Sequence, residues 1–153
     1  MAFNIKNLAP SGPYKHGDFS KYNPQKYFGE LPIIYRSGLE LNFMIKLEQN
    51  PNVEKWSSEH IRIPYILKER VKGKLVEKRH TYNTDFTVIM KNGIKYVIET
   101  KPSGLCPLNE SQIRRNPTMK KNAAKWSAAI NWCKSNGYVF RVITEIDLQR
   151  RTF

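Results

Sequence analysis

Long apolar runs and clustered cysteines are missing from this sequence of 153 residues. No run approaches the ~20 apolar residues that a membrane-spanning helix needs, and no charged start followed by an apolar segment indicates a secretion signal. The two cysteines, Cys106 and Cys133, stand alone, and His16, His60 and His80 lie far apart. Structural zinc is bound by clustered Cys and His ligands, so we expect no zinc site and two reduced thiols.

Acidic residues are also scarce. Lys and Arg total 26 against 13 Asp and Glu, which gives a formal net charge of +13. Such an excess favours a polyanionic partner, and nucleic acid is the commonest. A solvated basic surface and an anionic membrane surface are the alternatives, and the missing apolar span disfavours the membrane. The length suits one domain with a sizeable core.

Residues 1–35 are predicted to form an N-terminal arm in front of a single domain over 36–153. The arm contains prolines, glycines and aromatics interleaved with lysines, as in Lys26-Tyr27-Phe28, and it shows neither a helical nor a strand period. Three interpretations of its aromatics stay open. They pack on the main core, they stack on nucleic-acid bases, or they dock another protein.

Two helices are predicted from apolar periodicity. The first begins after Ser37 and ends at Asn50-Pro51. The second runs from about Thr118 to Ser135 and ends at Asn136-Gly137, where glycine suits a left-handed cap. A shorter helical turn is expected over 111–115.

Strands are expected between these helices, over 53–56, 60–67 and from Leu75 onwards, with Pro64 favouring an edge strand or a bulge. We expect them to form an antiparallel meander of three or more strands. Residues 138–143 follow the second helix, so this helical crossover predicts a parallel strand. The predicted fold is α/β, with a mixed central sheet flanked by helices.

Residues 83–101 hold two apolar-rich runs around an Asn-Gly, a pattern typical of a β-hairpin. A two-residue turn would put Asp85 and Glu99 on opposite faces. A three-residue loop, 91–93, instead makes one face continuously apolar and sets Asp85 opposite Glu99, with Cβ atoms roughly 5 Å apart. Lys101 then lies on the same face. We favour the three-residue loop.

Two carboxylates beside a lysine suit metal-dependent phosphodiester hydrolysis, which needs a cation to neutralise charge and a positioned water. Magnesium prefers oxygen ligands, which Asp85, Glu99 and the Thr100 carbonyl would supply. Lys101 would orient or deprotonate the water, or stabilise developing charge. In the alternative, structural interpretation, Asp85 caps the start of a strand and the other two side chains are merely solvated.

Asp85 followed by Glu99-Thr100-Lys101 resembles the PD-(D/E)xK nuclease core, although Thr84 stands in place of the signature's proline. Glu40 matches the glutamate that a preceding helix brings to that core. With Ser37 it also fits a capping box, and this second role stays open. The resemblance implies a restriction-endonuclease-like domain that uses Mg²⁺, or Mn²⁺ in its place. It also implies that Glu40, Asp85 and Glu99 are the metal-side carboxylates and that Lys101 is the catalytic lysine.

Residues 140–145, with Lys125-Trp126 on the preceding helix, also resemble the endonuclease subunit of heteromeric transposases. The patterns at 23–27 and 33–37, with Glu40, resemble the head completion nucleases of myovirus-type tailed phages. This implies a DNA endonuclease or exonuclease that acts after packaging, when a head joins a tail. Double-stranded DNA and head, portal or neck proteins would be its partners, in the host cytoplasm during assembly or in the virion.

Basic residues near the second helix are candidates for phosphate contacts, which position DNA without reading its sequence. They are Arg114, Arg115, Lys120, Lys121 and Lys125. For each, an ordinary solvated side chain is the alternative. Two other functions stay open: a structural DNA-binding completion protein without catalysis, and a recombination- or transposition-type endonuclease. No oligomeric state is predicted.

Overall fold

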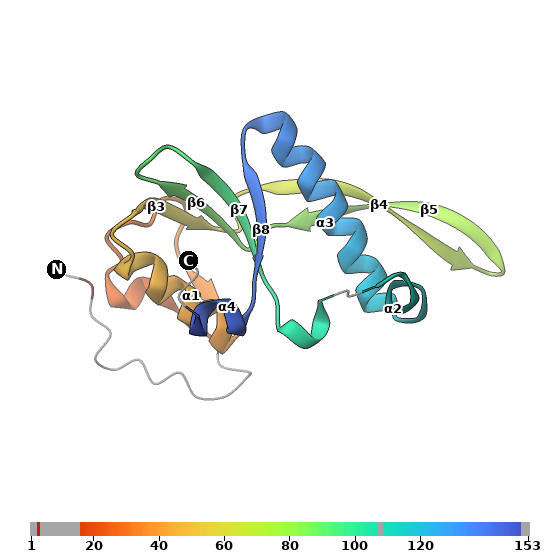
Figure 1. Ribbon diagram of the computed structural model, residues 1–153, viewed down its shortest axis with the longest axis horizontal. Coiled ribbons are helices and arrows are strands. Elements are labelled where there is room, and N and C mark those ends of the chain that lie inside the picture. The colour runs from red at the N-terminus through yellow and green to blue at the C-terminus, as the bar shows by residue number, and fades with distance from the viewer. Residues whose placement is uncertain (1–2, 4–15, 107–108, 151–153) are drawn as a thin grey trace.

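The computed structural model describes residue 3 and residues 16–106 and 109–150 (Figure 1). Its elements are β1 Gly17–Asp18, a 3-10 helix Phe19–Tyr22, β2 Ile34–Tyr35, α1 Gly38–Gln49, β3 Val53–Ser58, β4 Arg62–Val71, β5 Lys74–Asn83, β6 Phe86–Met90, β7 Lys95–Thr100, a 3-10 helix Ser103–Leu105, α2 Glu110–Arg115, α3 Pro117–Asn136, β8 Val139–Ile143 and α4 Glu145–Gln149. None of the helices in these ranges is long and apolar enough to cross a membrane. The predicted α/β class is confirmed.

A four-stranded sheet in the order β3-β6-β7-β8 forms the centre of the molecule. β3, β6 and β7 pair antiparallel, whereas β8 pairs parallel to β7. The parallel pairing follows from the crossover through α3, which returns the chain to the sheet in the same direction. The predicted mixed sheet is therefore confirmed.

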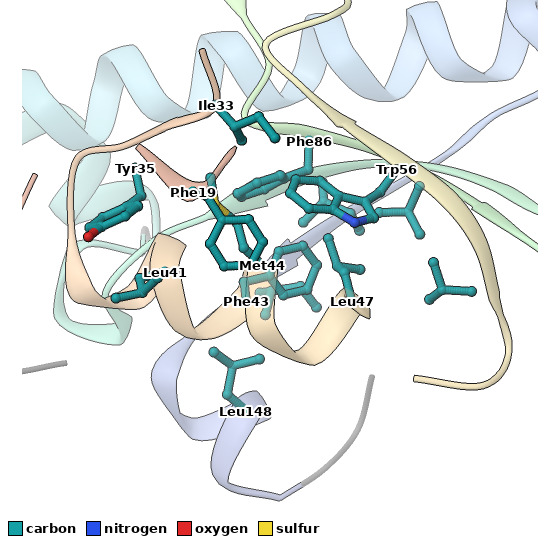
Figure 2. Packing of buried hydrophobic residues seen from close by; sticks show 14 residues of the cluster. Phe19, Ile33, Tyr35, Leu41, Phe43, Met44, Leu47, Trp56, Phe86 and Leu148 are labelled. Carbon is teal, nitrogen blue, oxygen red and sulfur yellow. The ribbon is translucent and has the colours of Figure 1, made fainter. Parts of the chain in front are cut away.

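The two faces of β7 are covered by different helices. Ile98 points into a buried cluster that contains α1 side chains such as Phe43, whose ring centre lies 5.0 Å from that of Phe86 (Figure 2). Val97 points the other way, into a cluster with Ala129 of α3. Successive side chains of a strand face opposite sides, so burial of both faces explains the apolar run Tyr96-Val97-Ile98 in the middle of β7.

Both long helices begin and end close to where the sequence predicts. The Ser37 hydroxyl accepts the N–H of Glu40 at 3.1 Å and caps α1. Asn116 caps α3 in the same way, one residue before Pro117. Gly137 ends α3 with φ at 78°, the left-handed conformation that glycine adopts without strain.

β4 and β5 form a two-stranded ribbon apart from the central sheet (Figure 1). The predicted continuous meander is therefore wrong, because β3 pairs with β6 and not with β4. Alternation along a strand indicates which face is buried but says nothing about the partner strand. Pro64 lies in this ribbon, where β4 pairs only with β5 among the described strands, so the predicted edge position is confirmed.

The described part of the predicted arm carries regular structure. β1 pairs with β2, and Phe19 and Ile33 are fully buried in the cluster around α1. The interpretation that arm aromatics pack on the core is confirmed for Phe19. The expected lack of strands is wrong here, because two-residue strands are too short to show a period. Tyr14 and its neighbours at 4–15 lie outside the described residues, and the boundary at residue 35 stays a prediction.

Candidate active site

The β6–β7 hairpin has the register that the sequence predicts. Phe86 pairs with Ile98, and the loop 91–93 ends at Gly93 with φ at 90°. The three-residue loop is confirmed. One residue pair further along this register, Asp85 lies opposite Glu99. Asp85 immediately precedes β6, and Glu99 is the second-last residue of β7.

Asp85 is held by the strand that faces it. Its Oδ2 accepts the Thr100 backbone N–H at 2.9 Å and the Thr100 hydroxyl at 3.1 Å. Burial and, to a smaller extent, the charge of Glu40 raise the pKa of Asp85 to about 6, against the Thr100 hydrogen bonds and the charge of Lys101. Thr100 thus orients Asp85, a role that its sequence position did not suggest, and metal binding by its carbonyl stays a prediction.

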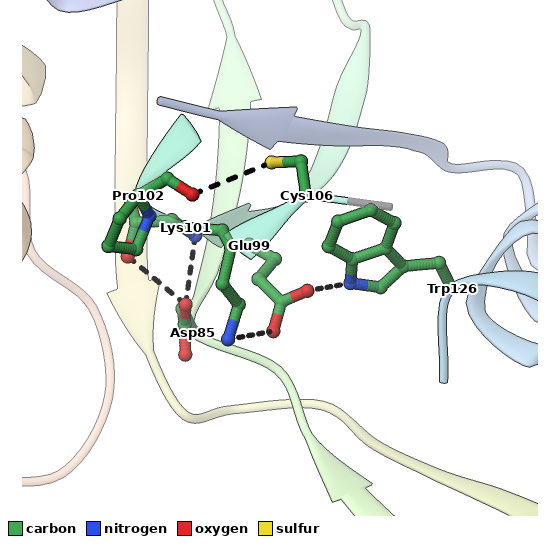
Figure 3. A network of polar contacts seen from close by, with 7 residues as sticks. Asp85, Glu99, Lys101, Pro102, Cys106 and Trp126 are labelled. Carbon is green, nitrogen blue, oxygen red and sulfur yellow. Dashed lines mark hydrogen bonds and ion pairs between the residues drawn. The ribbon is translucent and has the colours of Figure 1, made fainter. Parts of the chain in front are cut away.

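Glu99 is the more deeply buried carboxylate, with 3% of its surface exposed. Its Oε2 accepts the indole N–H of Trp126 from α3, and its Oε1 lies 3.8 Å from Lys101 Nζ (Figure 3). Burial and the charge of Asp85 raise the pKa of Glu99 to about 7, although Lys101 and Lys125 act in the opposite direction. The carboxylate pair and the lysine therefore meet as predicted.

Glu40 belongs to the same electrostatic cluster but is held at the start of α1. Its Oε2 accepts the backbone N–H of Arg36 at 2.9 Å, one residue before the cap at Ser37. Burial raises the pKa of Glu40, whereas the hydrogen bond from the Arg36 N–H and the positive charge of Lys101 lower it. Its charge in turn raises the pKa of Asp85. The predicted capping box is thus only half formed, because the Glu40 carboxylate reaches the N–H of Arg36 and not that of Ser37. The carboxylate still supports the start of the helix and also acts on the site.

α3 brings two further side chains close to the carboxylate pair, Lys125, which was predicted only as a phosphate contact, and Trp126, which was given no role. Burial lowers the pKa of Lys125, although the nearby Glu99 favours its charged form. Lys125 Nζ also lies 5.4 Å from the centre of the Tyr82 ring. The other four predicted phosphate-binding residues are exposed on α2 and the first turns of α3. The Lys125-Trp126 motif was the available signal, but it did not reveal the contact between Trp126 and Glu99.

Tyr82, at the end of β5, is a second residue that no motif indicated. Its hydroxyl is buried beside Glu99 and forms a side-chain hydrogen bond with that carboxylate. Burial raises the pKa of Tyr82, and the charges of Glu99 and Asp85 raise it further. The hydroxyl therefore stays protonated and is available as a donor beside the carboxylate pair.

A divalent cation fits this donor set. Among residues 16–106 and 109–150, no three His, Cys, Asp or Glu side chains form a ready-made metal cluster. Magnesium, however, needs only one or two carboxylates, because it keeps several waters. Asp85 and Glu99 are two such groups, and burial together with neighbouring negative charge disfavours their ionised forms. A bound cation would remove that penalty.

Comparisons with known proteins identify a family for this chain. Residues 50–145 match the family described as TnsA-like endonuclease N terminal. The chain is also 29% identical over 159 residues to the head completion nuclease of Enterobacteria phage T4, which covers 95% of this chain and 98% of that protein. The family match spans Asp85, Glu99, Lys101 and Trp126, whereas Glu40 precedes it. The chain therefore belongs to the TnsA-like endonuclease family, whose fold is restriction-endonuclease-like.

Proposed function

We propose that this protein is a divalent-metal-dependent DNA nuclease that acts in phage head completion and head–tail joining after DNA packaging. The observation that carries the proposal is the pairing of Asp85 with Glu99, with Lys101 3.8 Å from Glu99. The net charge of +13 suits a DNA substrate. The assembly role, with head, portal or neck proteins as partners, is supported by the similarity to the phage T4 protein.

The residues divide the work of hydrolysis between them. Asp85 and Glu99 would hold Mg²⁺, or Mn²⁺ in its place, and the ion supplies charge neutralisation at the scissile phosphate. Thr100 and Trp126 each bind one oxygen of a carboxylate and so orient the pair. Lys101 orients the attacking water and stabilises the negative charge that develops on the phosphate.

Cleavage of supercoiled plasmid tests this function. We expect the wild-type chain to nick the plasmid with Mg²⁺ or Mn²⁺ and to be inactive in excess EDTA, because both carboxylates act through the cation. Asp85→Asn should be inactive under all of these conditions. Glu54→Gln, an exposed change on β3 that also removes one negative charge, is the control and should cleave normally.

Two outcomes would contradict the proposal. Cleavage by Asp85→Asn at the wild-type rate would show that the site lies elsewhere. A wild-type chain that binds DNA in a salt-dependent way but never nicks it would favour the structural, non-catalytic alternative.

Glu40→Gln separates the two roles of Glu40. The amide oxygen can still accept the Arg36 N–H, so the start of α1 keeps its hydrogen bond while the charge near Asp85 is lost. We expect cleavage to fall by ~10- to 100-fold, the usual cost of losing a group that supports a metal site. Urea unfolding should show little change in stability. If the cleavage rate is unchanged as well, Glu40 serves only its helix.

A further inference from the structure

A basic groove lies between the β4–β5 ribbon and the start of α3. Its volume is about 580 Å³. The ribbon supplies one wall through Lys68 and Arg70, and α2 and α3 supply the other through Arg114, Lys120 and Lys121. Figure 1 shows the ribbon extending away from the central sheet, beside the first half of α3.

The groove presents positive charge that is not neutralised within the protein. Its lining holds five basic side chains and one acidic side chain, Glu69. Glu69 is already engaged by Lys78 at 3.4 Å and lies 3.3 Å from His80. In the part of the chain that the structure describes, neither Lys68 nor Arg70 forms an ion pair. The lining of the groove therefore carries a net positive charge, which an anionic occupant would complement.

The positive charge is continuous with the candidate active site. Lys121 and Lys125 lie four residues apart on α3, so they share a face and stand ~6 Å apart along the helix axis. The charge of Lys121 acts on Lys125, and that of Lys125 acts on Glu99. A row of cations thus leads from the carboxylate pair along α3 into the groove.

The ribbon starts at the site as well. β5 ends at Asn83, two residues before Asp85. Each strand of the ribbon is 10 residues long. Such a strand spans ~33 Å, close to the ~34 Å of one DNA helical turn. The ribbon therefore has the reach to follow a duplex for about one turn beyond the scissile phosphate.

We infer that this groove binds the phosphate backbone of duplex DNA on one side of the cleaved bond, with the β4–β5 ribbon as its outer wall. The inference rests on the proposed function, since it names the substrate track of the same site. An acidic protein surface would also satisfy the charge. A row of cations that leads directly to the carboxylate pair favours the nuclease's own substrate instead.

Salt-dependent DNA binding tests the groove without requiring cleavage. The binding of a labelled duplex of about 20 base pairs, roughly two helical turns, is followed by fluorescence anisotropy in EDTA at several salt concentrations. Each lost phosphate contact should reduce the slope of log affinity against log salt by ~0.9. We therefore expect a reduction of ~2 in Lys68→Gln/Arg70→Gln and in Arg114→Gln/Lys121→Gln. Lys91→Gln/Lys134→Gln removes the same charge from exposed positions outside the groove and should leave the slope unchanged.

The inference is wrong if the ribbon variant Lys68→Gln/Arg70→Gln has the same salt slope as the wild type. It is also wrong if the control variant Lys91→Gln/Lys134→Gln loses as much of the slope as the groove variants do. A ribbon variant that loses binding to polyglutamate but keeps its DNA slope also overturns it, since the groove would then take an acidic protein surface. Circular dichroism checks that the exposed changes leave the fold intact. If the wild type cleaves DNA but the groove variants keep the wild-type salt slope, only the inference about the groove is wrong. If the salt slope falls in the groove variants but the wild type never cleaves DNA, the groove binds DNA and only the proposed nuclease function is wrong.

Discussion

Lys101→Ala is expected to lower the rate of DNA cleavage by about 10³-fold and to leave cation binding intact. Lys101 Nζ lies 3.8 Å from Glu99 Oε1, on the same face of the hairpin as the carboxylate pair. Its positive charge repels a bound cation, so removing it does not weaken the metal site. The loss should therefore appear in the chemical step. Single-turnover cleavage and direct Mn²⁺ titration measure the two effects separately.

Lys95→Ala provides the matched control. Lys95 is the first residue of β7, on the face that Lys101 continues just beyond the end of that strand, and its ammonium group lies 4.7 Å from the ring centre of Tyr138. We expect near-normal cleavage from this variant. Normal cleavage by Lys101→Ala would remove Lys101 from the mechanism. Loss of Mn²⁺ binding together with cleavage would instead assign it a positioning role.

Glu99→Gln is expected to make the metal-free protein more stable near pH 8, even though it abolishes cleavage. The buried Glu99 carboxyl has its pKa raised from 4.5 to about 7. The folded state therefore binds this proton more tightly than the unfolded chain does. The resulting stability is present below the unfolded pKa and is lost as the pH rises through the folded value. Near pH 8 the charged Glu99 thus costs roughly 3 kcal/mol.

Glutamine removes that cost and still offers Trp126 an oxygen acceptor. In EDTA near pH 8 we expect the midpoint of thermal unfolding to rise by ~5 °C or more. Near pH 4 the difference should disappear, because Glu99 is then protonated in the folded state. Divalent cation should stabilise the wild type near pH 8 but not the variant. Glu54→Gln is the exposed control and should change neither result.

A lower unfolding midpoint for Glu99→Gln near pH 8 would contradict this account, since it would show that the ionised carboxylate supports the fold. The expected gain means that the sequence keeps two buried carboxylates at a cost in stability. Such a cost is typical of sites whose charges serve a ligand.

The sequence by itself determined the hairpin, its register and the face that carries Asp85, Glu99 and Lys101. These features are local, because loop length and the burial of alternate residues select one register over its neighbours. The helix ends at Ser37 and Gly137 were predictable for the same reason, since caps depend on residues within one turn.

Only the tertiary structure decided what surrounds that face. Trp126 reaches Glu99 from a helix 27 residues further along the chain, and β3 selects β6 as its partner across the whole ribbon. Such contacts depend on how distant apolar faces pack, which no local period encodes. The five-residue helix α4, with its capping box at Thr144, was also not predicted, because it is too short to show a helical period. Local pattern thus determined the face that carries the carboxylate pair, and long-range packing decided what surrounds it.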